Sequence, residues 1–319
     1  MTTVSPNHFK ARLVQANIGN FLKISSEKGE FNSIAEVYRQ YEQLSFKDNN
    51  NFDLLVWPET AIPTLFQTQR WTKNDFSYYP NIKKIIDQLP YQAGFVFGGY
   101  DLHQSTQSAD REYNTAFFFQ DQKLETYYKI KLIPFGETLP FGRWNDMLQP
   151  LFPGVSLFAQ GMKFQSFTLR KENNLVHFIT PICYELLDTF FMRNFLNSKQ
   201  HTELIINLTN DSWYGDTAEP WQHLFLARWR ALEFRRPILR STNTGITTLI
   251  DEQGKFSHYL PVNDKNTLDL SINLHSHPLT FYQQWGISLL LFVLATSWSI
   301  YFVKPAFMRS WRRKTPKKT

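Results

Sequence analysis

The chain has 319 residues, of which 42% are hydrophobic and 16% aromatic, enough to form a sizeable core. Its single cysteine excludes an intramolecular disulfide framework and a cysteine-based zinc site. The last 16 residues carry seven Lys or Arg and no acid, so removing seven from the net charge of +6 leaves −1 for residues 1–303. The basicity belongs to a short tail, and a nucleic-acid partner is therefore not expected.

Short apolar runs typical of β-strands alternate along the chain with amphipathic helical patterns. Strands are expected at 9–18, 52–59, 94–101, 113–119, 125–134, 175–185, 202–211 and 236–251. Helices are expected around 34–44 and over 80–89 and 218–236. This mixture predicts a protein of the α/β class, in which helices are layered on sheets.

Residues 134–161 form the longest stretch with neither a strand nor a helix pattern. Such long loops are usually functional lids or disordered, and the aromatic residues of this one argue against disorder. We expect the loop to be mobile and to touch a bilayer through its apolar residues. These residues are Phe135, Phe141, Trp144, Leu151, Phe152 and Phe158. The alternative is that they pack on the domain's own surface.

Residues 281–303 contain no charged side chain. About 20 apolar residues span a bilayer core, so this run predicts one transmembrane helix, with a buried core helix as the alternative. The basic residues 304–319 would then lie in the cytoplasm and residues 1–280 on the other side of the membrane. The N-terminus lacks the pattern of a signal peptide, which leaves the export of so large a domain unexplained.

Polar residues stand at or near the ends of three predicted strands, where α/β proteins build their sites. They are Glu59, Cys183 and one of the lysines at 129 and 131. A thiol nucleophile needs a base for its proton and a donor for the oxyanion, which a carboxylate and an ammonium would supply. Each residue also has a plainer interpretation. The thiol could be a small buried hydrophobe, the glutamate a helix start, and the lysines solvated.

The segments WPET, YYKIKLIPFGE, CYE and NDSWYGD, in this order, resemble the nitrilase superfamily with its Glu-Lys-Cys triad. Within it, VWPETAIP, YKIKLIPFGETLPF, ICYE and the run 207–251 resemble the apolipoprotein N-acyltransferase family over roughly residues 10–256. The resemblance implies a nitrilase-like α-β-β-α sandwich over residues 1–280. The transmembrane helix at 281–303 and the basic cytoplasmic tail at 304–319 would follow it.

Position by position, the resemblance implies that Glu59 is the general base, Lys129 stabilises the oxyanion and Cys183 is the nucleophile. The family's Tyr-x-Lys pattern selects Lys129 over Lys131, a choice that the residues alone leave open. No cofactor or metal is implied.

Supporting roles are implied for three further residues. Glu137 would orient the lysine, and Tyr184 and Glu185 would support the pocket. Taken alone, the two glutamates could be ordinary surface acids. His223 is expected to be a packed or hydrogen-bonded helix residue.

The implied reaction moves a fatty acyl chain from a phospholipid donor to the N-terminal amine of a diacylglyceryl-cysteine lipoprotein, through a thioester on Cys183. It would take place at the inner membrane, with the catalytic domain on the periplasmic side. One alternative is a membrane-anchored amidase of the same superfamily, in which water cleaves the thioester. Another is a membrane subunit without catalytic activity.

Members of the family carry several membrane helices ahead of the catalytic domain, and those helices help to form the lipid-facing site. Residues 1–280 contain no second charge-free run of about 20 residues. We therefore expect this chain to be half of an enzyme, inactive or weakly active alone. Three alternatives are open: a fragment, a wrongly assigned start, or the product of a split gene. In the last case a separate multi-helix membrane subunit would be its partner.

Overall fold

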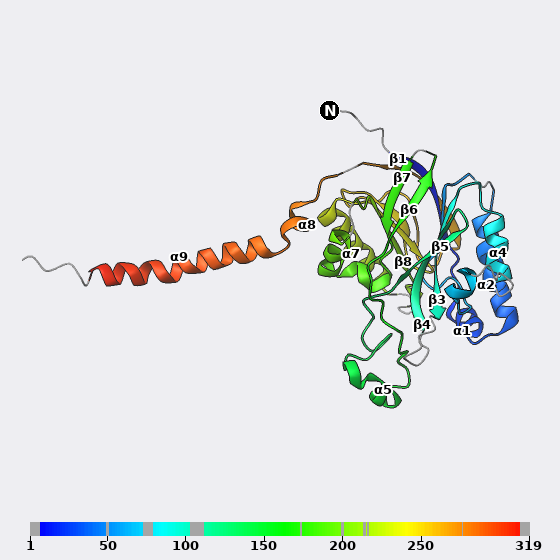
Figure 1. Ribbon diagram of the computed structural model, residues 1–319, viewed down its shortest axis with the longest axis horizontal. Helices are drawn as coiled ribbons and strands as arrows, with labels where there is room; N and C mark the ends of the chain where they lie inside the picture. The colour runs from blue at the N-terminus through cyan, green and yellow to red at the C-terminus, as the bar shows by residue number, and fades with distance from the viewer. Residues whose placement is uncertain are drawn as a thin grey trace, which may run out of the picture. The chain divides into compact units, whose positions relative to one another are not determined.

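The computed structural model describes residues 7–48, 51–72, 79–102, 112–172, 174–198, 201–212, 215, 217–275 and 277–312, and of residues 302–312 only the backbone. The chain divides into two compact units, Met1–Pro278 and Leu279–Thr319. The first unit holds two six-stranded sheets (Figure 1), and the second consists of helices.

The first sheet has the strand order β12-β1-β2-β3-β4-β5. Its strands are β1 (Asn7–Gln15), β2 (Leu54–Val56), β3 (Gly94–Leu102), β4 (Glu112–Gln120), β5 (Lys123–Tyr128) and β12 (Asn266–Leu274). Strands β1, β2 and β3 are parallel, while β4 is antiparallel to both β3 and β5. As a result β5 runs in the same direction as β2, and the two strands end at the same edge.

The second sheet has the order β11-β10-β9-β8-β7-β6. Its strands are β6 (Ser166–Lys171), β7 (Asn174–Ile179), β8 (Leu204–Thr209), β9 (Ile238–Thr242), β10 (Thr247–Ile250) and β11 (Tyr259–Leu260). Its centre, β7, β8 and β9, is parallel. Strand β8 is buried along its whole length and is correspondingly apolar, as expected for a parallel strand covered on both faces.

Helices cover the outer faces of the two sheets (Figure 1). They are α1 (Asn20–Glu27), α2 (Phe31–Ser45), α3 (Thr68–Thr72), α4 (Pro80–Asp87), α6 (Thr189–Asn197) and α7 (Glu219–Phe234). On one side Tyr41 of α2 stacks on Trp57 with ring centroids 4.6 Å apart. Between the sheets, Phe118 of β4 meets Phe178 of β7 edge to face at 5.1 Å. The predicted α-β-β-α sandwich is thereby confirmed.

The three predicted helices are present as α2, α4 and α7, but several predicted strands were wrong in extent, among them the one over 52–59, of which only Leu54–Val56 is a strand. The strand predicted over 125–134 ends at Tyr128. The N–H of Lys129 still donates to Asn114 of β4, but those of Ile130 and Lys131 bind a buried carboxylate instead of a neighbouring strand. The strand predicted over 175–185 ends at Ile179. The strand predicted over 236–251 is a hairpin of β9 and β10.

The second unit contains α8 (Phe281–Trp285) and α9 (Ser288–Arg312). The single helix predicted over 281–303 is therefore broken, at Gly286, whose φ of 56° is a conformation that glycine adopts readily. Among the described residues, no helix meets the length and apolarity needed to cross a bilayer, so the predicted span is not confirmed. Residues 313–319 of the predicted tail lie outside the described residues.

Candidate active site

Three of the predicted site residues lie at one edge of the sandwich. Glu59 follows the end of β2 by three residues, and Lys129 comes directly after β5. Cys183 begins the short 3-10 helix η4 (Cys183–Leu187) beyond the end of β7. Because β2 and β5 run in the same direction, their carboxyl ends bring Glu59 and Lys129 to one edge of the sheet. Cys183 lies at the same place, since it lines one pocket together with Glu59.

The turn that carries Glu59 lies directly against β3. The N–H of Gly98 donates to the carbonyl of Pro58 at 3.1 Å. A Cβ atom on Gly98 would stand 2.5 Å from that carbonyl oxygen and 2.6 Å from the Cα of Glu59. Glycine at this position of β3 therefore permits the close approach that seats the Glu59 carboxylate.

Lys129 is fully buried between two carboxylates. Its Nζ donates to Glu137 Oε1 at 2.7 Å and lies 3.4 Å from Glu59 Oε1. The side-chain amide of Asn114 donates to the same two oxygens, at 3.1 and 2.8 Å. Burial by itself disfavours the ammonium, but the charges of Glu59, Cys183 and Glu137 outweigh it and raise the pKa of Lys129. The lysine is thus a charged hydrogen-bond donor and not a base.

Glu137 is held in place by its own turn. Its backbone N–H donates to the carbonyl of Ile133 at 2.8 Å, and its Oε2 accepts from the N–H of Ile133 at 2.9 Å. This leaves Oε1 for Lys129. The predicted role of Glu137, to orient the lysine, agrees with this contact and remains a proposal.

Cys183 occupies a conformation that L-residues seldom adopt. Its φ is 49°, in the left-handed region, and its side chain is nearly buried. Burial and the charge of Glu59 raise the pKa of the thiol to about 12, against the opposing effects of Lys129 and a hydrogen bond from Thr209. At neutral pH the thiol keeps its proton, so it needs a base at the moment of attack.

Glu185 connects the two strand ends that carry the lysine and the cysteine. Its fully buried carboxylate accepts from the backbone N–H of Ile130 at 2.6 Å, of Lys131 at 2.9 Å and of Ile182 at 2.8 Å. The hydroxyl of Tyr127 donates to it at 2.9 Å. Burial raises its pKa to about 7, although the backbone donors act in the opposite direction. This carboxyl joins the two sheets beside Cys183.

Lys131 and Tyr184 lie apart from this group. Lys131 pairs with Asp188, and its Nζ stands 5.6 Å from the ring centroid of Tyr184. The structure thus brings Lys129, and not Lys131, to Glu59. Tyr184 is not among the described residues that line the pocket.

The pocket has a volume of about 380 Å³ and is open to solvent. Asn114 lines it from β4, and Lys23 and Glu27 line it from α1. None of these three was singled out from the sequence. Asn114 lies within the apolar segment 113–119. A polar residue in such an apolar run is a sequence feature that could have identified Asn114 as a site residue. No local pattern marks Lys23 or Glu27, because α1 reaches the site only through tertiary packing.

The loop over residues 134–161 projects from the two sheets with the short helix α5 (Asn145–Leu148) (Figure 1). Phe135, Phe141 and Phe152 pack against one another, with ring centroids 6.0 to 6.3 Å apart. Phe158 instead stacks on Tyr100 at 5.2 Å, inside the pocket. Some of the loop's aromatic rings therefore pack on the protein itself.

The loop also has an exposed apolar surface. Trp144, Met147 and Leu151 are 50%, 62% and 72% exposed. The bilayer contact expected for this loop remains a prediction.

Behind Cys183 lies a buried polar network. His223 Nδ1 lies 3.1 Å from Asp211 Oδ1, and Arg240 Nη2 donates to Asp211 Oδ2 at 2.8 Å. Glu219 Oε1 is 3.5 Å from the same imidazole nitrogen. Asp211, Glu219 and His223 lie close enough together to hold a cation, but the Arg240 guanidinium already neutralises Asp211. His223 is a hydrogen-bonded helix residue, as predicted.

The fold and this site define a class of protein. Residues 10–277 match the carbon-nitrogen hydrolase family, and the chain belongs to it. A solved carbon-nitrogen hydrolase superfamily protein from Xanthomonas campestris has the same fold, with a TM-score of 0.56 at 17% identity over 84% of this chain and 91% of that one.

Within the class, the chain is similar to curated proteins named apolipoprotein N-acyltransferase. The one from Bdellovibrio bacteriovorus is 34% identical over 87% of this chain and 51% of its own length. The one from Wigglesworthia glossinidia brevipalpis is 31% identical over 82% of this chain and 50% of its own length. The chain thus spans about half the length of the curated relatives that it matches.

Proposed function

We propose that this protein is an N-acyltransferase that moves a fatty acyl chain from a phospholipid to the N-terminal amine of a diacylglyceryl-cysteine lipoprotein. The observation that carries the proposal is the buried thiol of Cys183 in one pocket with Glu59, next to the ammonium of Lys129. The names of the curated relatives support this choice of reaction.

The first half-reaction forms a thioester. Glu59 takes the proton of the Cys183 thiol as sulfur attacks the ester carbonyl of the phospholipid. The Lys129 ammonium stabilises the oxyanion that develops on the carbonyl oxygen. The bond from the carbonyl carbon to the ester oxygen then breaks, Glu59 returns its proton to that oxygen, and lysophospholipid leaves.

The second half-reaction forms an amide. The uncharged amine of the acceptor attacks the thioester carbonyl and gives a proton to Glu59, while Lys129 again holds the oxyanion. The carbon–sulfur bond breaks, and the proton passes from Glu59 to the thiolate of Cys183. Glu137 keeps Lys129 in place through both steps, and Glu185 keeps the strand ends together.

The membrane context belongs to the same proposal. We infer that the charge-free residues 281–303 and the exposed apolar surface of the 134–161 loop bring the pocket to the lipid, at the inner membrane with the catalytic unit on the periplasmic side. The curated relatives are about twice as long as the matched segment, which supports a multi-helix membrane part as partner of this domain.

Acyl transfer in phospholipid vesicles tests the proposal. Purified protein, donor vesicles and a synthetic diacylglyceryl-cysteine peptide should give N-acyl peptide and lysophospholipid in equal amounts, and the Cys183→Ala variant should give neither. A multi-helix partner, supplied if the isolated chain is slow, should raise the rate. Release of free fatty acid with no acyl peptide, at every peptide concentration, would favour the membrane-anchored hydrolase instead.

A further inference from the structure

The active-site pocket contains a second buried ammonium. Lys23 of α1 lines the pocket together with Glu59 and Cys183, and it is only 8% exposed. Withdrawing an ammonium from water costs several kcal/mol unless other groups compensate. A lysine in such a place therefore has a structural or chemical reason to be there.

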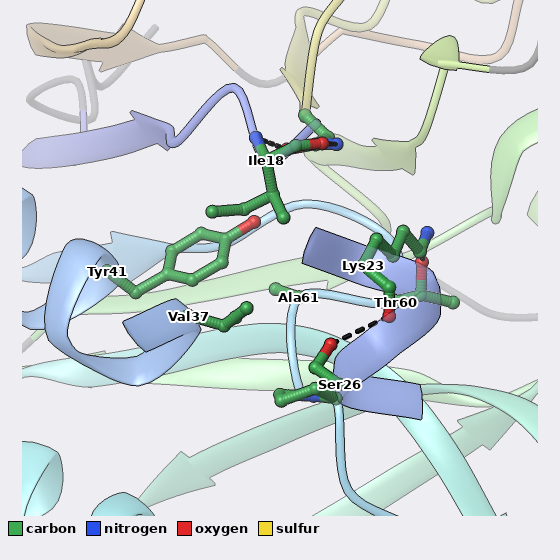
Figure 2. A pocket seen from close by; sticks show the side chains of 9 residues that line it. Ile18, Lys23, Ser26, Val37, Tyr41, Thr60 and Ala61 are labelled. Carbon is green, nitrogen blue, oxygen red and sulfur yellow. Dashed lines mark hydrogen bonds between the residues drawn. The ribbon is translucent and has the colours of Figure 1, made fainter. Parts of the chain in front are cut away.

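The Lys23 side chain binds the residue next to Glu59. Its Nζ donates to Thr60 Oγ1 at 2.5 Å and lies 4.0 Å from Glu27 Oε1. Figure 2 shows Lys23 and Thr60 next to each other at a small pocket of about 10 Å³, with Val37 and Tyr41 of α2 on its other side. Apolar side chains behind the lysine thus help to confine its charged end to the Thr60 side.

Thr60 adopts a strained backbone conformation. Its φ is 50°, and a β-branched residue in the left-handed region is a strained outlier. Such strain persists only where the surroundings over-determine it. Lys23 fixes the side chain of this turn, and the close approach of Gly98 fixes its backbone. The two contacts hold the turn from which the Glu59 carboxylate extends.

The site has fewer positive than negative charges, and the ammonium of Lys23 reduces this difference. Three carboxylates, those of Glu27, Glu59 and Glu137, line the pocket. Glu59 and Glu137 share the ammonium of Lys129, Glu27 lies beside Lys23, and a thiolate on Cys183 would add another negative charge. Among the described residues that line the pocket, Lys23 is the one cationic side chain. Burial lowers the pKa of Lys23 below its ordinary value, and the negative charges of Glu27, Glu59 and Cys183 offset only part of this effect.

The other groups that face Cys183 come from two elements. Thr209 and Asp211 lie at the end of β8, and His223 lies on α7, close to the backbone of Cys183. Asp211 is already paired with Arg240. Burial and the guanidinium of Arg240 lower the pKa of His223, so the imidazole is uncharged at neutral pH. These elements bring no further free positive charge to the thiol.

We propose that Lys23 is a positioning residue of this site, which holds the Glu59 turn through Thr60 and supplies the positive charge that favours the Cys183 thiolate. The inference rests on the proposed function, in which that thiolate is the nucleophile. It is a second lysine with a task different from that of Lys129.

Alkylation of Cys183 by iodoacetamide tests the electrostatic part directly, because the full chain has no other cysteine. Below the midpoint of the thiol, the rate follows the thiolate fraction, and one pKa unit corresponds to about a tenfold change. At pH 8–9 the Lys23→Met variant should react about 3- to 10-fold more slowly than the unchanged protein. Lys23→Arg should keep most of the rate. Lys28→Met, which removes an exposed charge just beyond α1, is the matched control and should react normally.

Lys23→Gln separates the two tasks, since it keeps a donor for Thr60 but removes the charge. Lys23→Gln should slow alkylation as much as Lys23→Met does. It also provides the test if Lys23→Met does not fold. Equal alkylation rates for Lys23→Gln and the unchanged protein, or equal slowing in Lys28→Met, would overturn the proposal. Because iodoacetamide needs neither phospholipid nor acceptor, a failure of acyl transfer would leave this result intact.

Discussion

At Lys129 one buried ammonium faces two carboxylates, and this geometry separates two lysines that are alike in sequence. Lys129 donates to Glu137 and lies near Glu59, whereas Lys131, two residues on, pairs with Asp188 outside the pocket. The residues of the YKIK segment do not by themselves reveal this difference, because the strand ends at Tyr128 and both lysines follow it, and Lys129 was selected only through the family's Tyr-x-Lys pattern. Only the positions of the carboxylates decide which lysine serves the site.

Replacing Lys129 by Met should therefore abolish most of the acyl transfer, while Lys131→Met should retain most of it. Loss of an oxyanion donor costs about 10²–10³ in rate. The measurement is kcat/KM for acyl transfer in vesicles, with the free energy of unfolding as a check on folding. A full rate in Lys129→Met together with loss in Lys131→Met would reverse the assignment.

Glu185 gives a prediction for the pH dependence of stability. Burial raises its pKa from an ordinary value of 4.5 to about 7 in the folded protein. The folded protein therefore holds this proton to higher pH than the unfolded chain does, and the stability from this group is lost as pH rises from about 4.5 to about 7. Between pH 4.5 and 7 the free energy of unfolding should fall more in the unchanged protein than in Glu185→Gln. The difference between the two decreases should be about 1–3 kcal/mol. Denaturant titrations at pH 4.5, 6 and 7.5 measure the free energy of unfolding of both proteins. Parallel pH curves for the two proteins would exclude the assigned shift.

At the scale of elements, the site depends on contacts between segments far apart in the chain. Periodicity identified α2, α4 and α7 and most of the central strands, because these segments bury continuous apolar faces. It did not identify α1, which brings Lys23 to the pocket, or η4, which begins at Cys183 with a positive φ. The end of β5 was also missed, since it is set by Glu185, which lies 55 residues along from Ile130.

Gly98 and Gly99, neighbours in β3, offer a matched pair of substitutions. A Cβ on Gly98 would stand 2.5 Å from Pro58 O, whereas a Cβ on Gly99 would meet Ile62 Cβ at 3.2 Å, a smaller overlap with a side chain. Gly98→Ala should displace the Glu59 turn and lower acyl transfer by about 10-fold or more, because small misplacements of reacting groups are costly. Gly99→Ala should change it only a few-fold. Equal activities in the two variants would show that the turn does not depend on this approach.

At the scale of the whole molecule, the sequence predicted more of the site than of the chain's organisation. The motif set selected Glu59, Lys129 and Glu137, and the fold brings their side chains into contact around Lys129. The sequence alone could not show that the apolar run divides into α8 and α9 at Gly286. The glycine is the only feature of the run that marks this break. The helix expected to span the membrane is likewise unconfirmed among the described residues.

The matched relatives are about twice as long as the segment that aligns with this chain. Glu59, Lys129 and Cys183 all lie within the first unit, Met1–Pro278. The chemistry at Cys183 can therefore be measured separately from lipoprotein acylation, which we expect to depend on membrane parts as well.

Intact-mass measurement of the protein after incubation with phospholipid vesicles tests the central proposal most directly. The protein should gain the mass of one acyl chain, hydroxylamine should remove it, and peptide mapping should locate it on Cys183. The Cys183→Ala variant should gain nothing. An acyl adduct that persists in Cys183→Ala, or unchanged mass in folded protein supplied with donor vesicles and a membrane partner, would contradict the account.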